Sequence, residues 1–338
     1  MSNKLYIITN ESFYLKDNKY FCDNIDLKSI PEEISKNKEI FIICRNSKIP
    51  RTKHVNIKKI QNNNNILSYL ISIIKSFDAE KKEYLIISIS PFTFFASLIL
   101  KIFLKRHFIY LRSDGHEEYK SILGFIGPLI YSLMFNIASI NSNLISCRKH
   151  ILKNKNGEIV HPSQLNEKWF LPEKKLDLDK INLLYVGRIR VEKGIFSLLD
   201  LIEDSKINLT IVTSEKEIKL KKKLNNVKVT NFENYDDAII KFYDEHNIFI
   251  LPSYTEGHPQ VLDEALARMR PVIIFEEISH VTRGRKGVFI CNRNLYSLEK
   301  TINYIKNNYS IITKEMKKNT LPTKKSFINE LTNIIFKN

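Results

Sequence analysis

The chain has 338 residues, of which 43% are hydrophobic, so it is long enough and apolar enough for two domains with separate cores. Lys and Arg number 53 against 37 Asp and Glu, which gives a net charge of +16. The sequence holds no internal repeat and no heptad array, which excludes solenoid and coiled-coil architectures.

The positive charge is unevenly distributed along the chain. Residues 1–175 hold 27 Lys and Arg against 16 Asp and Glu, whereas residues 176–338 hold 26 against 21. The first half therefore suits an anionic partner, such as a nucleic acid, an anionic membrane surface or a phosphorylated substrate. A low-GC coding sequence, which favours Lys and Asn, is the alternative explanation.

The start of the chain is predicted to be a short strand, because no apolar signal region or small-residue cleavage site follows it. The four cysteines have no spacing typical of a metal site, and most lie in apolar or strand-like surroundings. We therefore expect reduced thiols in a cytosolic protein. The cysteines are Cys22, Cys44, Cys147 and Cys291.

Strands alternate with helices in the first half, which predicts a parallel sheet covered on both faces. The segment Asn10–Phe13 is interpreted as the first strand-to-helix loop. The predicted strands are 5–9, 40–44, 54–57, 84–89, 108–111, 144–146 and 158–160. The predicted helices are 66–74, 92–104 and the stretch that ends at 140.

Two stretches of the first half have the length and composition of a membrane span. Tyr84–Leu104 contains Pro91, several hydroxyls and Lys101, so it is predicted to be a buried strand followed by a core helix. Ser121–Ile140 carries no charge but contains two glycines and a proline. It is expected to be either a core helix or a helix that lies in the membrane interface.

The second half repeats the alternation after Leu171–Lys180, a charged segment with a proline turn that resembles a linker. The sequence therefore predicts two doubly wound domains with a cleft between them. The predicted strands are 182–186, 208–212, 227–229, 247–251, 272–275 and 287–290. The predicted helices are 194–202, 216–224, 235–245, 295–307 and 324–336.

One unit of the second half, Pro252–Ile273, brings two carboxylates to a helix N-terminus. It is predicted to be a loop, a helix with Pro259 as its first residue, and a strand. Glu256 lies in the loop, and Glu264 in the second helical turn leans back toward it, because helical side chains tilt toward the N-terminus. This arrangement suits a ligand with hydroxyls for the carboxylates and a phosphate for the free N–H groups.

A basic loop follows the strand 182–186. Gly187 and Arg188 end this strand, and Lys193 opens the next helix, so both cations lie at the carboxyl end of a strand. An Arg and a Lys at this spacing can hold a diphosphate. Because Glu192 lies between them, an ordinary exposed charged loop is the alternative interpretation.

Residues 181–291 resemble the nucleotide-binding domain of retaining family 4 glycosyltransferases, also called glycosyl transferases group 1. The matching segments are YVGRIRVEKG (Tyr185–Gly194), LPSYTEGHPQVLDEALA (Leu251–Ala267) and the PVI that follows. The resemblance implies the GT-B fold, an α/β architecture of two doubly wound Rossmann-like domains that face a cleft. It implies an acceptor domain over 1–172, a nucleotide-sugar domain over 173–323, and a helix over 324–338 that crosses back to the first domain.

The resemblance also implies roles for the residues that match the motifs. Arg188 and Lys193 would hold the donor diphosphate and stabilise it as a leaving group, and Glu256 would face the donor sugar. Glu264 would bind the ribose hydroxyls. No metal and no cofactor are expected, since the nucleotide-diphosphate sugar is the donor substrate. The other donor-binding residues expected are Gly187, Gly257, His258, Pro259 and Gln260.

The chain departs from the family pattern at several positions. Asn10–Phe13 lacks the usual glycines, Thr213 and Ser214 replace a common glycine pair, and Met269 replaces the glycine before PVI. In the first half, His116 and Asp114 lie near the place where the family often has a catalytic or sugar-contacting histidine. Since His116 comes a few residues late, an ordinary loop histidine is the alternative.

The resemblance implies a retaining glycosyltransferase that builds bacterial surface polysaccharide, such as O-antigen, capsule or lipopolysaccharide. Its acceptor would be a saccharide or a polyprenyl-diphosphate-linked sugar. We expect a cytoplasmic protein that is peripheral on the inner face of the cytoplasmic membrane, with an anionic membrane surface as partner.

Two other classes of function remain open. One is a nucleotide-sugar epimerase or phosphorylase of the same fold. The other is a basic membrane- or nucleic-acid-binding protein without catalysis. A nucleic-acid partner is not expected, because the chain has no aromatic-and-basic strand motif and no zinc knuckle.

Overall fold

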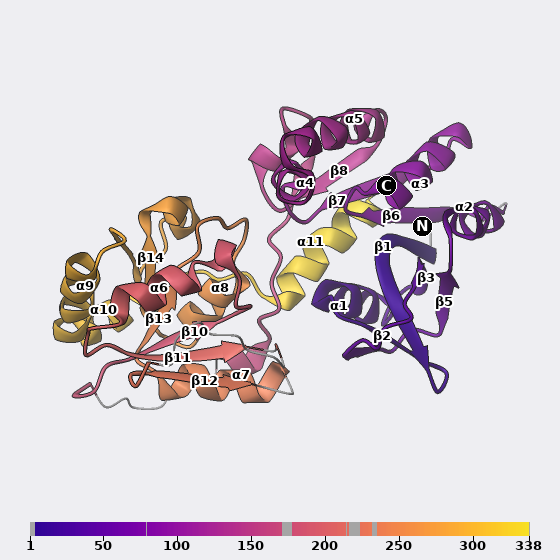
Figure 1. Ribbon diagram of the computed structural model, residues 1–338. Coiled ribbons are helices and arrows are strands. Elements are labelled where there is room, and N and C mark those ends of the chain that lie inside the picture. The colour runs from indigo at the N-terminus through magenta and orange to yellow at the C-terminus, as the bar shows by residue number, and fades with distance from the viewer. Residues whose placement is uncertain are drawn as a thin grey trace. The chain divides into compact units, whose positions relative to one another are not determined.

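The computed structural model describes residues 4–78, 80–170, 178–213, 215, 224–231 and 235–337, and it divides into two units. The first unit comprises Met1–Pro162 and Lys325–Asn338, and the second comprises Ser163–Lys324. Each unit is built on a sheet of mainly parallel strands with helices packed on it (Figure 1). The predicted class, two doubly wound α/β domains, is confirmed.

The first unit has a nine-stranded sheet. Its parallel part has the order β5-β3-β1-β6-β7-β8-β9, while β2 and β4 extend antiparallel from the end of β1. The strands are β1 (Lys4–Lys16), β2 (Lys19–Cys22), β3 (Glu39–Asn46), β4 (Lys53–Val55), β5 (Lys59–Asn63), β6 (Lys82–Ile87), β7 (His107–Leu111), β8 (Asn143–Ser146) and β9 (Glu158–Ile159).

The prediction of a loop at Asn10–Phe13 is wrong, because β1 continues through this segment. The register against β3 shifts between Ile8 and Ser12, and the strand then resumes with Phe13 fully buried. Asp17 and Asn18, both with positive φ, then turn the chain into β2, as in a two-residue hairpin. The absence of glycine is explained, since no strand-to-helix loop is present there.

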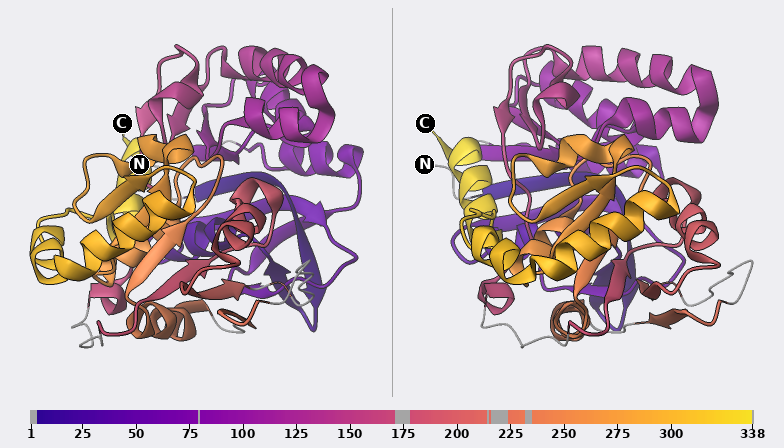
Figure 2. Two further views of the ribbon diagram at one scale, coloured as in Figure 1. Left: turned by 60° about the vertical axis from the view of Figure 1, so that its left-hand side comes forward. Right: turned by 90° about the vertical axis from the view of Figure 1, so that its left-hand side faces the viewer.

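Helices cover both faces of the first sheet. Residues of α1 and α11 share one core cluster with the sheet, and residues of α2, α3 and α5 share the other. Figure 2 shows the yellow α11 against the first unit's strands. The helices are α1 (Ile25–Ile34), α2 (Ile66–Lys75), α3 (Pro91–Ile102), α4 (Gly115–Leu123), α5 (Gly127–Ser139) and α11 (Lys324–Phe336).

The apolar stretch Ser121–Ile140 belongs to a helical hairpin. Gly124, with φ of +65°, ends α4, and α5 begins at Gly127 after one short 3-10 turn. The two helices pack closely, since a Cβ on Gly127 would overlap the carbonyl of Tyr119. One side of α5 is core, as one interpretation expected, and the other side is exposed. The buried residues of α5 are Gly127, Tyr131, Met134, Phe135 and Ala138.

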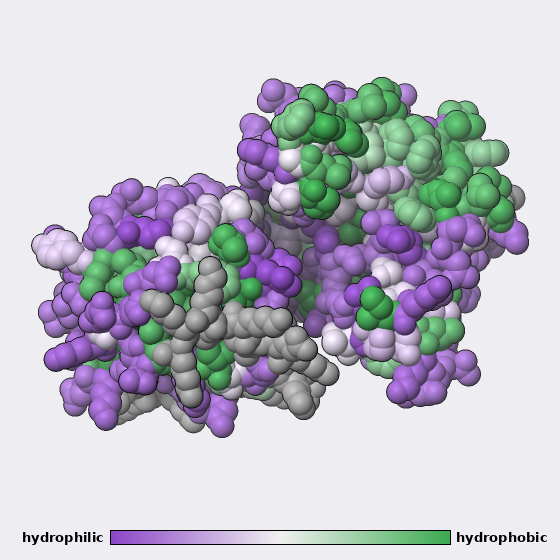
Figure 3. All heavy atoms as spheres, in the orientation of Figure 1, coloured by the Kyte–Doolittle hydropathy of each residue, from purple (hydrophilic) through white to green (hydrophobic). Residues whose placement is uncertain are grey.

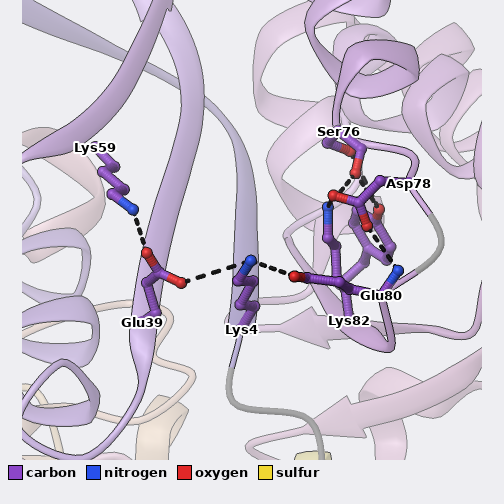
Figure 4. A network of polar contacts seen from close by, with 8 residues as sticks. Lys4, Glu39, Lys59, Ser76, Asp78, Glu80 and Lys82 are labelled. Carbon is purple, nitrogen blue, oxygen red and sulfur yellow. Dashed lines mark hydrogen bonds and ion pairs between the residues drawn. The ribbon is translucent and has the colours of Figure 1, made fainter.

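Ion pairs connect the amino ends of neighbouring strands in the first sheet (Figure 4). Lys4, the first residue of β1, pairs with Glu39, the first residue of β3, at 3.9 Å, and it also pairs with Glu80. Lys59, the first residue of β5, pairs with the same Glu39. The charges at this amino edge therefore compensate one another, whereas Asp114 and His116 lie beyond the opposite, carboxyl edge.

The second unit has a six-stranded parallel sheet of order β12-β11-β10-β13-β14-β15. Numbered within the unit this is 3-2-1-4-5-6, the order of dinucleotide-binding folds, in which ligands bind where the order reverses. The strands are β10 (Asn182–Val186), β11 (Asn208–Thr213), β12 (Val227–Asn231), β13 (Ile248–Leu251), β14 (Val272–Phe275) and β15 (Val288–Cys291). The helices are α6 (Ile195–Ile202), α7 (Tyr235–Glu245), α8 (Gln260–Ala267), α9 (Leu295–Asn307) and α10 (Tyr309–Met316).

The second unit begins at Ser163, earlier than the sequence-based boundary at 172/173. The reason is burial, since Leu165 and Trp169 belong to the second core. Most of the expected linker, residues 171–177, and most of the expected helix 216–224 lie outside the described residues. The helix α10 was not predicted.

We expect Phe327→Ala to lower the free energy of unfolding of the first unit by about 3–5 kcal/mol, because removing a fully buried ring leaves a cavity. Urea unfolding followed by far-UV circular dichroism measures this loss. Trp169, the single tryptophan, lies in the second core, so its fluorescence transition should stay unchanged. The exposed Tyr296→Ala is the control, and an unchanged dichroism curve for Phe327→Ala would contradict the packing of α11.

Candidate active site at the carboxyl edge of the second sheet

Two loops meet where the strand order of the second sheet reverses. The loop 187–194 follows β10 and the loop 252–259 follows β13, and these strands are neighbours. Lys193 Nζ lies 2.7 Å from Glu256 Oε1, and the Ser253 hydroxyl donates to the same oxygen at 2.6 Å. The Glu256 side chain is 9% exposed and that of Lys193 is 24% exposed. The structure thus brings this expected cation and this expected carboxylate into direct contact.

The backbone holds these two loops together. The Tyr254 amide donates to the Glu192 carbonyl at 3.0 Å. Gly194 has φ of +66°, and a Cβ there would overlap the carbonyl oxygen of Pro252. Only glycine fits such a close approach in a left-handed conformation. The contact between Lys193 and Glu256 therefore depends on Gly194.

Arg293, just beyond β15, contacts the loop after β13 and holds it in place. Its guanidinium donates to the Pro252 carbonyl at 3.0 Å and to Glu277 at 2.7 Å. It also lies 4.2 Å from the ring centres of Tyr254 and Phe275, a distance suited to cation–π contact. Sequence reasoning missed Arg293, since no motif marks it and only tertiary packing brings it to this loop.

Arg188 is exposed at the end of β10, and no ion pair of its side chain is found among the described residues. The Tyr185 hydroxyl donates to the Arg188 carbonyl at 2.7 Å. Burial, together with the nearby Glu256 carboxylate, raises the pKa of Tyr185, so this phenol stays a donor. A Cβ on Gly187 would lie 2.7 Å from the same hydroxyl, so Gly187 leaves room for this contact.

Glu215 is a second residue that sequence reasoning missed. Its carboxylate accepts from the Ile189 amide at 2.9 Å and pairs with Arg190 at 3.1 Å. It therefore holds the basic loop from the side of β11. Of the two residues that replace the family's glycine pair, Thr213 is buried at the end of β11, and Ser214 lies outside the described residues.

Glu264 lies in the second turn of α8, as expected, but its side chain is 1% exposed. Its carboxylate accepts from the hydroxyl of Tyr243, on α7, at 2.9 Å. The Glu264 carboxylate is thus held on the side of α8 that faces α7. The Glu256 carboxylate instead contacts Lys193 in the loop after β10.

The start of α8 differs in detail from the prediction. Pro259 has extended geometry, with ψ of 102°, so it is the cap residue and the helix begins at Gln260. The side chain of His258 lies along the helix, 3.4 Å from Asp263, instead of pointing to open solvent. Gly257 is exposed, and a Cβ there would meet nothing within 4 Å. The loop before α8 therefore has open space at Gly257.

Asp114 and His116 come together in the first unit, beyond the carboxyl end of β7. Asp114 caps α4 by accepting from the His116 amide at 2.9 Å, and it pairs with Lys153 at 3.0 Å. The His116 ring lies 4.8 Å from the ring of Tyr131 and 5.9 Å from that of Phe135, so it is also a packing residue. No group of three or more His, Cys, Asp or Glu that could hold a metal is found in the described part of either unit.

The charge of Asp114 is stabilised by its partners. Partial burial acts to raise the pKa of Asp114, but the Lys153 ammonium and the His116 amide outweigh it, so the pKa is lowered. The ionised form therefore stabilises the folded state above the unfolded pKa, and this contribution is lost as the pH falls through the folded pKa.

We expect Gly194→Ala to destabilise the second unit more than Gly284→Ala. Both glycines have similar positive φ, +66° and +69°, but a Cβ on Gly284 meets nothing within 4 Å. The left-handed conformation costs alanine roughly 1–2 kcal/mol at either site, and overlap with Pro252 should add about 1–3 kcal/mol at Gly194. Urea unfolding followed by Trp169 fluorescence measures both, and equal losses would argue against the close approach.

We expect Asp114→Asn to reduce stability at neutral pH and to have little effect in acid. Asparagine caps a helix about as well as aspartate, so the variant removes the charge and keeps the cap. Urea midpoints measured from neutral pH down through about pH 3 should converge for the two proteins. A difference that does not change with pH would show that the ion pair with Lys153 contributes nothing.

Known proteins resemble the second half of the chain in sequence. Residues 166–321 match the family described as glycosyl transferases group 1. An uncharacterized glycosyltransferase of Haemophilus influenzae is 32% identical over 155 residues, 42% of this chain and 43% of the relative. Another, of Methanocaldococcus jannaschii, is 26% identical over 151 residues, 41% of this chain and 42% of the relative. The chain thus spans less than half the length of these relatives.

Solved structures resemble the whole chain in fold. WaaG, a glycosyltransferase involved in lipopolysaccharide biosynthesis, has a TM-score of 0.64 at 12% identity, over 99% of this chain and 100% of that one. HepE of Anabaena, solved with UDP and glucose, has a TM-score of 0.63 at 12% identity, over 99% and 96%. The UDP-GlcNAc 2-epimerase of Methanocaldococcus jannaschii has a TM-score of 0.56 at 15% identity, over 99% and 100%.

These matches bear out the family and the fold that the motifs of the second half indicated. Two parallel-sheet α/β units match GT-B glycosyltransferase structures over nearly the whole chain. The sequence match covers the unit in which Lys193 meets Glu256. Residues 166–321 therefore form a domain of the glycosyl transferases group 1, and the chain has the GT-B fold.

Proposed function

We propose that the protein transfers a sugar, with retention, from a nucleotide-diphosphate sugar to a saccharide or lipid-linked acceptor. The observation that carries this proposal is the contact of Lys193 with Glu256 beside the exposed Arg188. All three belong to the two loops that follow β10 and β13, where ligands of doubly wound sheets bind. The UDP bound in the HepE structure supports a nucleotide donor of this class.

The residues have distinct roles in the proposed transfer. Breaking the bond between sugar and diphosphate develops negative charge on the leaving group, and fixed cations stabilise that charge. Lys193 and Arg188 supply the cations, and the first turn of α8 beside Gly257 supplies N–H groups. Glu256 faces the sugar, where positive charge develops at the anomeric carbon.

The ion pair of Lys193 with Glu256 compensates both charges within the two loops. A nearly buried carboxylate without a partner would be costly, and the Lys193 ammonium and Ser253 hydroxyl satisfy it. A bound diphosphate would be a second anionic partner for Lys193, beside Glu256. Glu264, anchored by Tyr243, is proposed to bind the ribose hydroxyls from the inner side of α8.

The first unit is proposed to take the acceptor beyond the carboxyl ends of its strands. Asp114 and His116 lie there, with the Asp114 charge maintained by Lys153. The resemblance in fold to WaaG, which is involved in lipopolysaccharide biosynthesis, favours a surface polysaccharide pathway. The proposed location is the inner face of the cytoplasmic membrane.

A nucleotide-sugar epimerase is the second candidate, because an epimerase shares this fold over the whole chain. The loop with Arg188 and Lys193 next to Glu256 favours transfer, since it matches the family's donor site. The two reactions differ in their products. A transferase releases free nucleotide diphosphate only when acceptor is present, so a screen of nucleotide sugars with and without saccharide acceptors distinguishes them.

We expect Glu256→Gln and Lys193→Ala each to lower kcat/KM for transfer by at least about a hundredfold, because each removes a charge that the transition state requires. Steady-state transfer assays measure the loss, and thermal unfolding verifies that the variants fold. Glu299→Gln and Lys300→Ala, exposed on α9 of the same unit, are the matched controls. Full activity of either site variant would overturn the assignment.

A further inference from the structure

Three neighbouring helices of the first unit are apolar on two sides. The helices α2, α3 and α5 pack on one face of the first sheet and share its core. In α2, Tyr69 and Ile73 are buried, yet Leu67, Ile71 and Ile74 form a second stripe that is 70%, 49% and 43% exposed. A surface helix of a soluble domain normally has one apolar stripe, so the outward stripe requires its own explanation.

The outward stripes continue over α3, α5 and the turn that precedes α5. Figure 3 shows hydrophobic atoms gathered over the part of the molecule where Figure 1 labels α3 and α5. We call this set, with the α2 stripe, the apolar surface. Its exposed residues beyond α2 are Phe95, Ile102, Phe103, Leu104, Ile122, Leu123, Phe125, Ile126, Leu129, Ile130, Leu133 and Ile140. Contiguous exposed patches of this kind mark protein or membrane contacts.

The charges within three segments that form most of the apolar surface have one sign, whereas α4 carries Glu117 and Glu118 before it reaches this surface. The segments 66–75, 91–106 and 121–142 contain Lys75, Lys101, Lys105 and Arg106 and no Asp or Glu. Lys101, Lys105 and Arg106 flank the apolar segment 102–104 at the carboxyl end of α3, where Leu104 is 92% exposed. An apolar surface with cations at its margin complements a membrane interface that carries anionic headgroups.

The geometry favours contact with the interface over a span. The helical stretch Gly115–Ser139 is long and apolar enough by composition to cross a membrane, and only 28% of its most apolar window is buried. It bends at Gly124 into the hairpin of α4 and α5, however. The 13 residues of α5 reach about 20 Å, short of the roughly 30 Å apolar thickness of a bilayer.

We propose that the apolar surface docks the protein on an anionic lipid bilayer, with the turn 122–126 entering the boundary between headgroups and acyl chains. A second copy of the chain is the less favourable occupant. Symmetric pairing would place the margin cations of one copy near those of the other, whereas anionic lipid neutralises them. Phe125, 84% exposed at the tip of the hairpin, is the deepest residue in this arrangement.

The docked surface connects directly to the proposed acceptor edge. The helix α4 begins at Gly115, next to Asp114, and leads to the turn that enters the lipid. A lipid-linked acceptor held at the bilayer would therefore lie near the carboxyl edge of the first sheet. This consequence rests on the proposed function, whereas docking itself requires neither donor nor acceptor.

Vesicle co-sedimentation of the full chain tests the proposal without any transfer assay. The probes are vesicles of phosphatidylcholine alone and of phosphatidylcholine mixed with phosphatidylglycerol. The protein should bind the mixed vesicles more tightly. Leu129→Gln/Leu133→Gln should weaken that binding at least about tenfold, because both side chains lie on the outward stripe of α5. Ile49→Gln, equally exposed in the same unit but outside the surface, should bind as the wild type does.

The contribution of charge is tested separately. Lys75→Gln/Lys105→Gln should weaken binding to the mixed vesicles by roughly tenfold and leave binding to neutral vesicles unchanged. Lys16→Gln/Lys19→Gln, on the hairpin of β1 and β2, is the matched control. Folding of the first unit in every variant is verified by urea unfolding followed by circular dichroism.

Three results would overturn the proposal. The first is a wild-type protein that stays in solution with both kinds of vesicle. The second is unchanged binding by the Leu129/Leu133 variant. The third is a wild-type dimer, detected by light scattering, that this variant converts to a monomer without any vesicle binding, since the apolar surface would then be covered by a second copy.

Discussion

The contact of Lys193 with Glu256 is the interaction on which the site depends, and the order of the second sheet creates it. The two residues are 63 positions apart in the chain, yet β10 and β13 lie side by side where the strand order reverses. Their loops therefore leave the sheet at the same edge. Gly194 has no side chain, and this permits the close approach, since a Cβ there would overlap the Pro252 carbonyl.

Two residues that no sequence motif marks hold the loops that carry this contact. Arg293 holds the Pro252 carbonyl and lies against two aromatic rings, while Glu215 holds the opposite loop by its Ile189 amide. A buried or half-buried charge stabilises the fold only when several partners compensate its loss of water. Arg293 and Glu215 each have several partners, and these contacts hold the loop in one geometry. The site is thus preorganised, because each of its two loops is held by a charged residue that follows another strand of the sheet.

The two edges and one helix-covered face of the first sheet carry different groups of residues. Its amino edge is closed by ion pairs among the first residues of neighbouring strands. The carboxyl edge carries Asp114 and His116, and the face covered by α2, α3 and α5 carries the apolar surface. The helical hairpin joins the last two, because α4 starts beside Asp114 and its turn lies in the apolar surface. The proposed acceptor edge and the proposed docking surface are therefore joined by α4.

The sequence by itself determined the elements whose signals are local. The bounds of β10, α7, β14, α9 and α11 agree with the prediction, since apolar period, caps and prolines act within a few residues. The family and the fold also followed, because the motifs of the second half are contiguous. Only the tertiary structure decided the continuation of β1 through Asn10–Phe13, the burial of Glu264 against Tyr243 and the position of Arg293. These features arise from contacts between segments far apart in the chain, and no local pattern encodes such distances.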